Sequence, residues 1–394
     1  MRSKYDAVVV GAGPAGAMAA YEIASAGYSI LLLEKHKRPG MPLCCAEAVS
    51  RAQLESLIEP KEEWISSRIE RARVTAPDGC QATVFRKRAG YILERKLFDH
   101  ALVRRAEEAG AVLECEAIGH DLKKVDGIFR SIIILRPDGS QCLVEARIFI
   151  AADGVESQAA RRAGINNLFE RKEVLSALQY RMEDIEVEDD MIQFFVGSKV
   201  APQGYIWVFP KSPRSANVGV GIAGTERRGA KTAVYLDRFI SEHFCSGRIA
   251  ERYCGMIPRY QGGANFRAGN LLVVGDAART VDSFSGAGIV NGMLSGKYAG
   301  LAAAEYLSGR LGDIDEIERF YPGRFLDEKG EELSLYARLR RAYENFGDAD
   351  FTDIVLGLRE YFSNHSTDGV HVGKLIIGII RARPRLIRLV RHLI

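Results

Sequence analysis

The chain has 394 residues, of which 47% are hydrophobic and 27% charged, and its formal net charge is +3. These values exclude a disordered or collagen-like chain, and they give the chain as a whole no electrostatic basis for binding nucleic acid. The length favours two domains, or one nucleotide-binding domain that carries insertions.

The seven cysteines, at positions 44, 45, 80, 115, 142, 245 and 254, are odd in number and lack paired metal-ligand spacing. We therefore expect free thiols and no metal site. The first residues run into an apolar strand without the features of a secretory signal, and no apolar run is long enough to span a bilayer. These features predict a cytoplasmic location.

The N-terminal segment predicts a βαβ unit. Residues 6–10 are typical of a buried parallel strand, residues 14–26 of an alanine-rich helix, and residues 29–33 of a second strand. The crossover of such a unit is right-handed, and its ligand binds beyond the carboxyl ends of the strands.

A glycine motif lies between the first strand and the helix. Gly11 permits a tight turn, Gly13 lets the backbone approach a pyrophosphate, and Gly16 lets helix and strand pack closely. Glu34 follows the second strand and is placed to accept hydrogen bonds from ribose hydroxyls. The motif predicts a dinucleotide site, with further contacts at Pro14, Ala15 and Lys35, and it does not separate NAD from FAD.

Later segments are typical of antiparallel sheet. Residues 71–92 and 193–222 alternate apolar and polar side chains around turns. Residues 127–150 predict strands joined at a Pro-Asp-Gly turn, and residues 270–274 predict another buried strand. Beyond about residue 315 the pattern is helical.

The C-terminal end is basic. Residues 369–394 hold six Lys/Arg and no Asp/Glu, and residues 385–394 project as an amphipathic helix with an arginine face. Two interpretations are open: the helix docks on anionic lipid headgroups, or it packs on its own domain with a solvated arginine face.

Three short motifs follow the glycine motif in the order found in one flavoprotein superfamily. They are an RxxFD-like segment at Arg95, Asp153-Gly154, and Gly275-Asp276 before a glycine-rich helix start at Gly286. With these motifs the chain resembles the para-hydroxybenzoate hydroxylase-type superfamily and, within it, the geranylgeranyl reductase family. The resemblance implies bound FAD, contacted also by Cys45, Ala46, Gly288 and Ile289, and it assigns the ribityl hydroxyls to Asp276.

Two segments carry the resemblance to the reductases. Residues 202–210 resemble the family's PxxYxWxFP signature and place Tyr205, Trp207 and Phe209 on one strand face, where they line a prenyl chain or fill the sheet's core. Residues 42–50 resemble a Cys-Gly-Glu/Asp-Gly segment, with Ala46 and Ala48 in place of the glycines. This departure predicts a less free backbone and a reshaped substrate site.

The resemblance implies an FAD-dependent reductase that saturates isoprenoid double bonds of a geranylgeranyl-type lipid. Reduced flavin N5 would deliver hydride while the other alkene carbon receives a proton from Cys45, Glu47 or Tyr205, with Trp207 beside them in the site. A flavin monooxygenase and an electron carrier to membrane quinone remain alternatives. The partners implied are a prenyl lipid and either NAD(P)H or a ferredoxin-like donor. The first interpretation of the C-terminal helix adds a peripheral contact with the inner face of the cell membrane.

The expected fold is α/β, with a Rossmann-type (GR2-like) FAD-binding domain, an inserted antiparallel-sheet substrate domain and a C-terminal helical region. The expected bounds are 1–66, 93–176 and 252–318 for the FAD-binding domain, 67–92 and 177–251 for the substrate domain, and 319–394 for the helical region.

Overall fold

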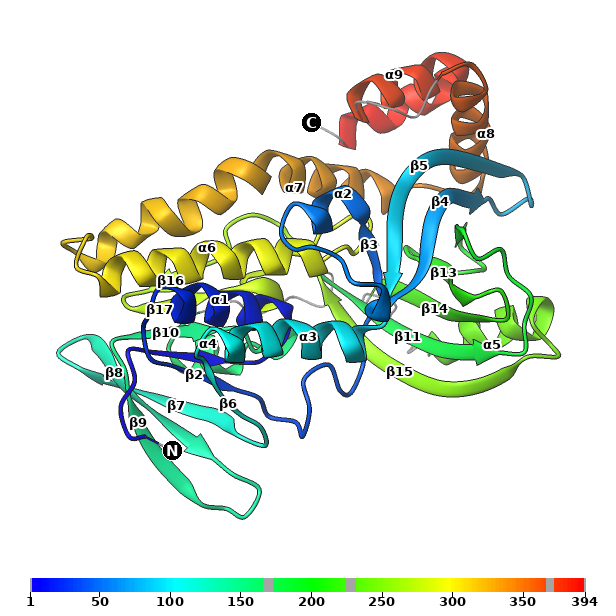
Figure 1. Ribbon diagram of the computed structural model, residues 1–394. Coiled ribbons are helices and arrows are strands. Elements are labelled where there is room, and N and C mark those ends of the chain that lie inside the picture. The colour runs from blue at the N-terminus through cyan, green and yellow to red at the C-terminus, as the bar shows by residue number, and fades with distance from the viewer. Residues whose placement is uncertain (1, 166–172, 224–231, 366–371, 393–394) are drawn as a thin grey trace. The chain divides into compact units, whose positions relative to one another are not determined.

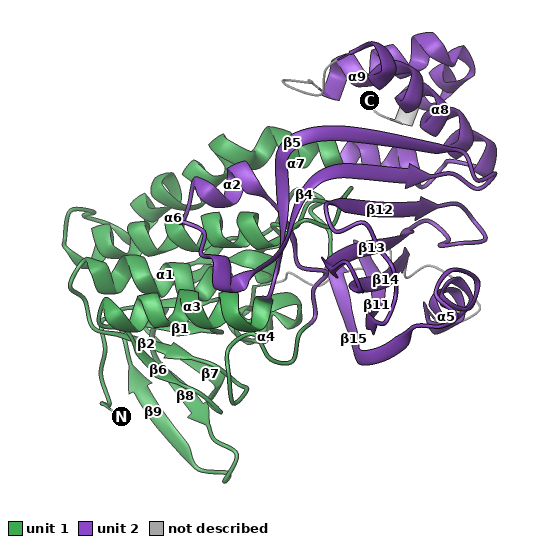
Figure 2. Ribbon diagram, turned by 45° about the vertical axis from the view of Figure 1, so that its right-hand side comes forward, with its two compact units in different colours: residues 1–43, 95–169, 258–336 green, residues 44–94, 170–257, 337–394 purple. Residues whose placement is uncertain are grey.

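The computed structural model describes residues 2–165, 173–223, 232–365 and 372–392 (Figure 1). The chain divides into two compact units (Figure 2). Unit 1 comprises residues 1–43, 95–169 and 258–336, and unit 2 comprises residues 44–94, 170–257 and 337–394. Both are discontinuous in sequence.

Unit 1 is built on a sheet that has six strands among the described residues, in the order β16-β17-β10-β1-β2-β6. Its core strands are parallel, and β16 pairs antiparallel with β17. The strands are β1 (Ala7–Val10), β2 (Ile30–Leu33), β6 (Val112–Glu114), β10 (Ile148–Ala151), β16 (Arg267–Ala268) and β17 (Leu271–Val273). Every residue of β1, β2, β10 and β17 is buried, which explains why these segments are continuous apolar runs.

Two helices of unit 1, α1 (Pro14–Ser25) and α6 (Ile289–Leu307), lie side by side (Figure 1). A Cβ atom on Gly296 of α6 would lie 2.0 Å from the carbonyl oxygen of Ala15, so only glycine allows this approach. Unit 1 also contains α3 (Arg95–Glu108), α4 (Gln158–Arg162) and a three-stranded sheet of β7 (Ile118–Val125), β8 (Ile128–Leu135) and β9 (Gln141–Glu145).

Unit 2 contains a sheet that has eight strands among the described residues, in the order β15-β11-β14-β13-β12-β4-β5-β3. The pairs β11–β14, β14–β13, β13–β12, β4–β5 and β5–β3 are antiparallel, and β12 and β4 are parallel. The strands are β3 (Ala48–Ser50), β4 (Ile65–Thr75), β5 (Gln81–Leu93), β11 (Val174–Glu183), β12 (Met191–Val196), β13 (Tyr205–Ser212), β14 (Ser215–Ala223) and β15 (Arg248–Pro258).

The two faces of the unit 2 sheet carry different clusters. Ile206 and Val208 of β13 pack with Leu236 and Phe239 of α5 (Thr232–His243) in one apolar cluster. Trp207, between them in sequence, belongs to a second cluster. The alternation of β13 therefore separates a core face from the face that carries the aromatic signature.

Residues 44–66, expected in the FAD-binding domain, belong to unit 2. The reason is strand pairing, because β3 pairs with β5 across Ala48 and Ile92 and so joins the antiparallel sheet. The segment also holds the short helix α2 (Arg51–Glu55). The expected C-terminal region is divided within α7 (Arg324–Tyr343), whose residues up to 336 belong to unit 1.

The chain ends in α8 (Asp348–Asn364), α9 (Val372–Ala382) and a 3₁₀ helix (Pro384–His392). The last of these is tighter than the α-helix expected for residues 385–394, and residues 393 and 394 lie outside the described chain. Proline at its start lacks the N–H that would continue α9. Arg385 pairs with Asp353 of α8, and Arg388 pairs with Asp350. These two arginines are thus held against their own unit.

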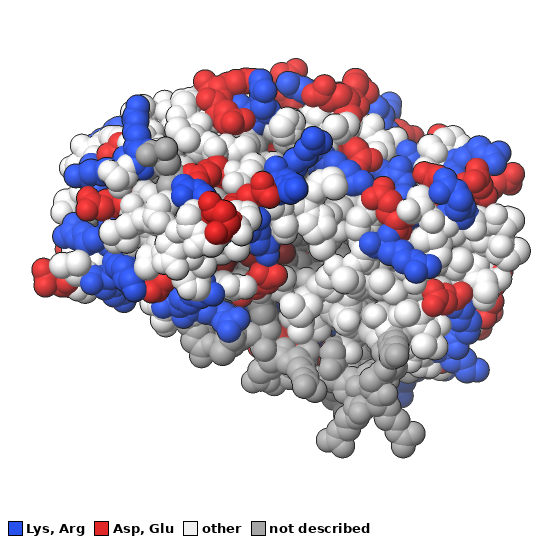
Figure 3. All heavy atoms as spheres, turned by 90° about the horizontal axis from the view of Figure 1, so that it is seen from below, with Lys and Arg blue, Asp and Glu red and all other residues white. Residues whose placement is uncertain are grey.

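In the described residues no helix is long and apolar enough to cross a membrane. On the face shown in Figure 3, Lys and Arg side chains are interspersed with Asp and Glu. All seven cysteines are unbridged.

Candidate functional site

The glycine motif of unit 1 forms a loop with one open position. A Cβ on Gly11, whose φ is 104°, would lie 2.3 Å from the carbonyl oxygen of Ala152, and one on Gly16 would lie 1.9 Å from that of Gly11. A Cβ on Gly13 would meet no atom within 4 Å. Of these three glycines, only Gly13 leaves free space for a ligand that approaches the backbone.

This open position is the N-cap of α1, and no described side chain caps it. The first N–H groups of a helix lack internal partners and carry partial positive charge, so they bind phosphate oxygens well. Glu34 is 8% exposed and lies next to the loop, with Oε2 accepting from the N–H of Ala12 at 3.1 Å. Glu34 thereby ties the glycine loop that follows β1 to the end of β2.

A second group of predicted residues surrounds Asp276, which follows Gly275 after β17. Burial raises the pKa of the Asp276 carboxyl, and the guanidinium of Arg95 opposes this rise. A Cβ on Gly288, the N-cap of α6, would lie 3.4 Å from Asp276 Oδ1, so the carboxyl is beside that helix N-terminus. The Arg95 guanidinium also donates to Asp99, with Nη2 2.7 Å from Oδ2.

Among the described residues of unit 1, three buried side-chain oxygen atoms have no hydrogen-bond partner: Asp153 Oδ1, Ser157 Oγ and Thr280 Oγ1. The other carboxyl oxygen of Asp153 accepts from the N–H of Ala159 at 2.8 Å and holds the start of α4. Burial raises the pKa of Asp153, against these backbone hydrogen bonds. Buried polar atoms without partners are rare and indicate a missing ligand or water.

The residues of unit 1 fit a dinucleotide cofactor. The open position at Gly13 suits a diphosphate, and the buried carboxyl and unpaired oxygens suit hydroxyl donors of a ribose or ribityl chain. Most of the remaining predicted contacts lie on the same unit: Pro14 and Ala15 open α1, Lys35 pairs with Glu156 at 2.9 Å, Gly154 begins a 3₁₀ turn, Gly286 precedes α6, and Ile289 is its first helical residue. The two other predicted contacts, Cys45 and Ala46, belong to unit 2.

Unit 2 brings the three predicted aromatic residues together. Ring centroids are 5.9 Å apart for Tyr205 and Trp207, and 6.4 Å apart for Trp207 and Phe209. Phe194 of the neighbouring strand lies edge-on to Tyr205 and to Phe209. Trp207 and Phe209 are buried, whereas Tyr205 and Phe194 are half-buried. Ala46 and Ala48 pack against the same cluster.

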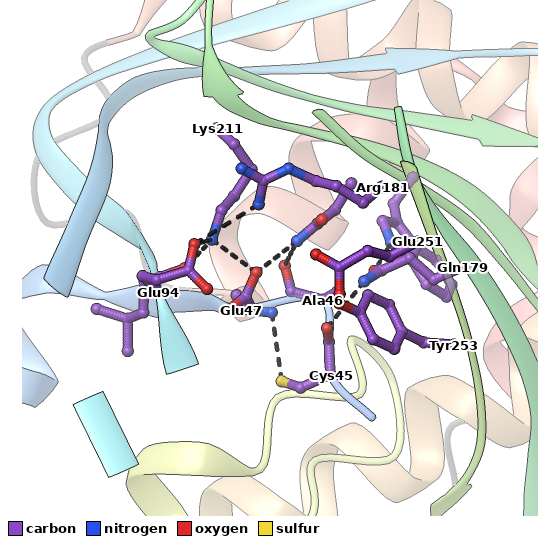
Figure 4. Close-up of polar contacts among 12 residues, drawn as sticks. Cys45, Ala46, Glu47, Glu94, Gln179, Arg181, Lys211, Glu251 and Tyr253 are labelled. Carbon is purple, nitrogen blue, oxygen red and sulfur yellow. Dashed lines mark hydrogen bonds and ion pairs between the residues drawn. The ribbon is translucent and has the colours of Figure 1, made fainter. Parts of the chain in front are cut away.

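Gln179 of β11 connects this cluster to Cys45. Its Oε1 accepts from the indole N–H of Trp207 at 2.9 Å, and its Nε2 donates to the carbonyl oxygen of Cys45 at 3.0 Å (Figure 4). The Cys45 Sγ accepts from the N–H of Glu47 at 3.3 Å. The predicted Cys45 segment and the aromatic signature are thus held together by one side chain.

Glu47 is the left-handed residue of this segment, with φ of 74°, and Ala46 and Ala48 are not at positive φ. Alanine therefore replaces the expected glycines at two positions without backbone strain. A non-glycine residue at positive φ persists only where its surroundings hold it. Here the Glu47 side chain is fully buried, and its Oε2 accepts from Lys211 Nζ and Asn217 Nδ2, both at 2.7 Å.

Sequence reasoning missed Gln179, Lys211 and Asn217. A signal was present for two of them. Lys211 directly follows the aromatic signature, and Asn217 lies in the strand Ser215–Ala223, which is otherwise made of small and apolar residues. Lysine and asparagine are seldom fully buried unless they are paired, so their position in apolar strands indicates a polar partner.

Two family models match the chain. Residues 173–257 match the geranylgeranyl reductase catalytic domain, and residues 9–55 match an NAD(P)-binding Rossmann-like domain. The first match covers the aromatic signature with Gln179, Lys211 and Asn217. The second covers the βαβ unit and its glycine motif.

Relatives that align over almost their whole length are also named as reductases of geranylgeranyl lipids. The chain is 36% identical to a digeranylgeranylglycerophospholipid reductase of Methanoculleus marisnigri, over 98% of this chain and 97% of the relative. It is 35% identical to the reductase of that name from Methanocella arvoryzae, over 98% of each chain.

Among solved structures, a geranylgeranyl bacteriochlorophyll reductase-like protein from Thermoplasma acidophilum covers 100% of both chains with a TM-score of 0.91 and 29% identity. The myxobacterial chondrochloren halogenase CndH, an FAD-dependent halogenase, covers 97% of both chains with a TM-score of 0.72 and 18% identity. At that identity the halogenase likeness concerns the fold alone.

Proposed function

The chain belongs to the geranylgeranyl reductase family of FAD-dependent oxidoreductases, and we propose that it saturates the isoprenoid double bonds of a digeranylgeranylglycerophospholipid. The observation that carries the substrate class is the aromatic signature of β13, which lies in an apolar cluster tied to Cys45 through Gln179. The relatives that share almost the whole length of the chain are named for this substrate.

Reduced FAD, when bound, supplies the hydride for one carbon of the double bond. The residues for holding it are those of unit 1: the N–H groups at Gly13 for the diphosphate, Glu34 for the ribose, and Asp276 with the start of α6 for the ribityl chain. An unactivated alkene is a poor hydride acceptor, so a positioned acid and a dry site must assist the transfer.

Unit 2 supplies the acid and the apolar surface in this proposal. Tyr205, Trp207 and Phe209 provide the wall against which a prenyl chain packs, and the methyl groups of Ala46 and Ala48 extend it. Cys45 carries a thiol proton and Tyr205 a hydroxyl proton that can be donated, and both residues are half-buried.

An anaerobic experiment tests the function. The holoprotein is reduced chemically, mixed with a digeranylgeranyl glycerophospholipid, and followed by flavin absorbance and by the mass of the lipid. We expect the lipid to gain hydrogens in steps of two as the flavin is reoxidised. A matched lipid with saturated chains should leave the flavin reduced.

Two other outcomes would point to the alternatives. A lipid that gains oxygen only after air is admitted would contradict reduction and indicate a monooxygenase. An unchanged lipid with rapid reoxidation by a quinone would indicate an electron carrier. The Rossmann-like match does not identify the electron donor, because it covers the same βαβ unit that we assign to FAD. Comparing NADPH with a reduced ferredoxin as reductant separates the two proposed donors.

We also propose that the C-terminal end contacts a membrane surface. Ile377 of α9 and Ile387 of the last 3₁₀ helix are 52% and 66% exposed. The side chains of Arg385 and Arg388 are 56% and 60% exposed although both are paired with acids of α8. Exposed apolar side chains next to arginines suit an anionic lipid surface.

A further inference from the structure

Unit 2 contains a buried charge cluster that the proposed chemistry leaves unexplained. Its centre is the ion pair of Glu47 and Lys211, whose side chains are both fully buried (Figure 4). Lys211 Nζ also lies 3.1 Å from Glu94, whose carboxylate is 3.6 Å from Arg181. Two carboxylates and two cations thus balance in charge.

Stability alone is a weak reason for such a pair. Removing two charges from water costs about as much as their attraction returns, and apolar residues of similar volume often serve equally well. The pair is also formed across a long sequence separation, by the last part of β13 and the segment that precedes β3. Its location next to Cys45 therefore indicates a role in the site.

The contacts show what the pair holds. Glu47 Oε2 accepts from Lys211 and from Asn217, whose Nδ2 also donates to the carbonyl oxygen of Ala46 at 3.3 Å. The backbone of Glu47 is equally engaged, since its carbonyl accepts from the N–H of Leu93 at 2.9 Å. The N–H of Glu47 in turn donates to Cys45 Sγ. The anchored left-handed residue thus fixes the direction of the thiol.

We propose that Lys211 is a positioning residue of the reductase, which acts through Glu47 to hold the Cys45 thiol in the orientation required for proton donation. Glu47 is then a fixed hydrogen-bond acceptor and does not donate the proton. This inference rests on the proposed function for its chemical purpose, whereas the anchoring of the Cys45 segment is a property of the folded chain.

The test uses the holoprotein and two readouts. Hydrogen exchange of the peptide that spans residues 44–50 measures the anchoring without any lipid. In Lys211→Met we expect the exchange rate of this peptide to rise on the order of tenfold, because about one net hydrogen bond is lost. The exchange rates of β12 and β14 should not change. Arg71→Met is the control, because Arg71 of β4 also bridges two carboxylates, those of Glu188 and Asp190 in the segment before β12.

The second readout is prenyl-lipid reduction. We expect Lys211→Met to lower kcat about tenfold to a hundredfold with little change in KM, as expected for a misplaced reacting group. In a Cys45→Ser background the same substitution should have almost no further effect, because Lys211 acts through Cys45. If the two substitutions lower kcat independently, so that their fold-changes multiply in the double variant, the proposal is overturned.

Lys211→Met leaves the Glu47 carboxylate buried without its cation and is at risk of misfolding. Glu47→Gln/Lys211→Met removes both charges and serves as the second variant. We expect it to unfold like the wild type yet to retain the fast exchange at residues 44–50 and the low kcat. Wild-type exchange and wild-type kcat in this double variant would refute positioning. If the wild type reduces no prenyl lipid, the proposed function is wrong. The hydrogen-exchange measurement still tests whether Lys211 anchors residues 44–50.

Discussion

Gly219 offers a sharp test of the aromatic site. It lies opposite Trp207 in the β13–β14 ladder, and a Cβ atom there would be 2.3 Å from Cζ2 and 2.4 Å from Cε2 of the indole. Ordinary contact between such atoms begins near 3.4 Å. In Gly219→Ala the buried indole must therefore move by roughly 1 Å, which is a case of overpacking.

The expected cost follows from two terms. Overpacking a buried site costs about 1–3 kcal/mol, and a displaced indole also loses its hydrogen bond to Gln179, worth about 1 kcal/mol. We expect Gly219→Ala to lower the free energy of unfolding of unit 2 by about 2–4 kcal/mol. Because Gln179 also binds the carbonyl of Cys45, prenyl-lipid reduction should fall as well.

Gly221→Ala is the matched control on the same strand. Its Cβ would lie 3.6 Å from Trp207 Cζ3 and 3.8 Å from the nearest atom of Leu175, which is ordinary contact. Urea unfolding followed by Trp207 fluorescence, in a Trp64→Phe background, measures both variants. Equal unfolding free energies for Gly219→Ala and Gly221→Ala would refute the placement of the indole.

Three further predictions concern the other parts of the chain. Gly13→Ala, at the open position, should lower flavin content with little change in unfolding temperature, whereas Gly16→Ala should lower the unfolding temperature itself; absorbance and thermal unfolding separate them. Burial raises the pKa of Asp276 above its unfolded value. The ionised carboxyl therefore lowers the stability of the apoprotein, and this loss of stability grows as pH rises from the unfolded pKa through the folded pKa. Below the unfolded pKa the loss is absent. Asp276→Asn should thus stabilise the apoprotein at neutral pH but not in acid, while flavin affinity falls. Ile387→Ser should weaken co-sedimentation with anionic vesicles, and Val234→Ser, at a residue of α5 that is 61% exposed, should not.

The features that sequence predicts well are local. The βαβ unit follows from apolar runs and glycines within about thirty residues, and its strands and helix lie within one or two residues of their expected bounds. Gly11 has the positive φ that the predicted tight turn favours, and a Cβ on Gly16 would lie 1.9 Å from the carbonyl oxygen of Gly11, in keeping with the predicted close packing. The alternation of β13 likewise places its aromatic residues on one face.

The features that sequence does not predict depend on distant pairings. Lys211 has no visible partner in the sequence, because Glu47 lies 164 residues earlier and meets it only through the strand register of unit 2. Gln179 lies 134 residues from Cys45 and 28 residues from Trp207, so its two hydrogen bonds also depend on how the chain folds in unit 2. The strand at Ala48–Ser50 is too short for a periodic pattern, so the assignment of residues 44–66 required its pairing with β5.

The buried pair also bears on how an apolar site supplies a proton. A prenyl chain requires a dry surface, where an unpaired carboxylate or ammonium would be strongly disfavoured. Glu47 and Lys211 compensate each other, so this part of the site contains charge without a net charge. One oxygen of the Glu47 carboxylate, Oε2, already accepts two hydrogen bonds, from Lys211 and Asn217. Proton donation then falls to a group that is neutral in an apolar setting, which favours Cys45 or Tyr205 over Glu47.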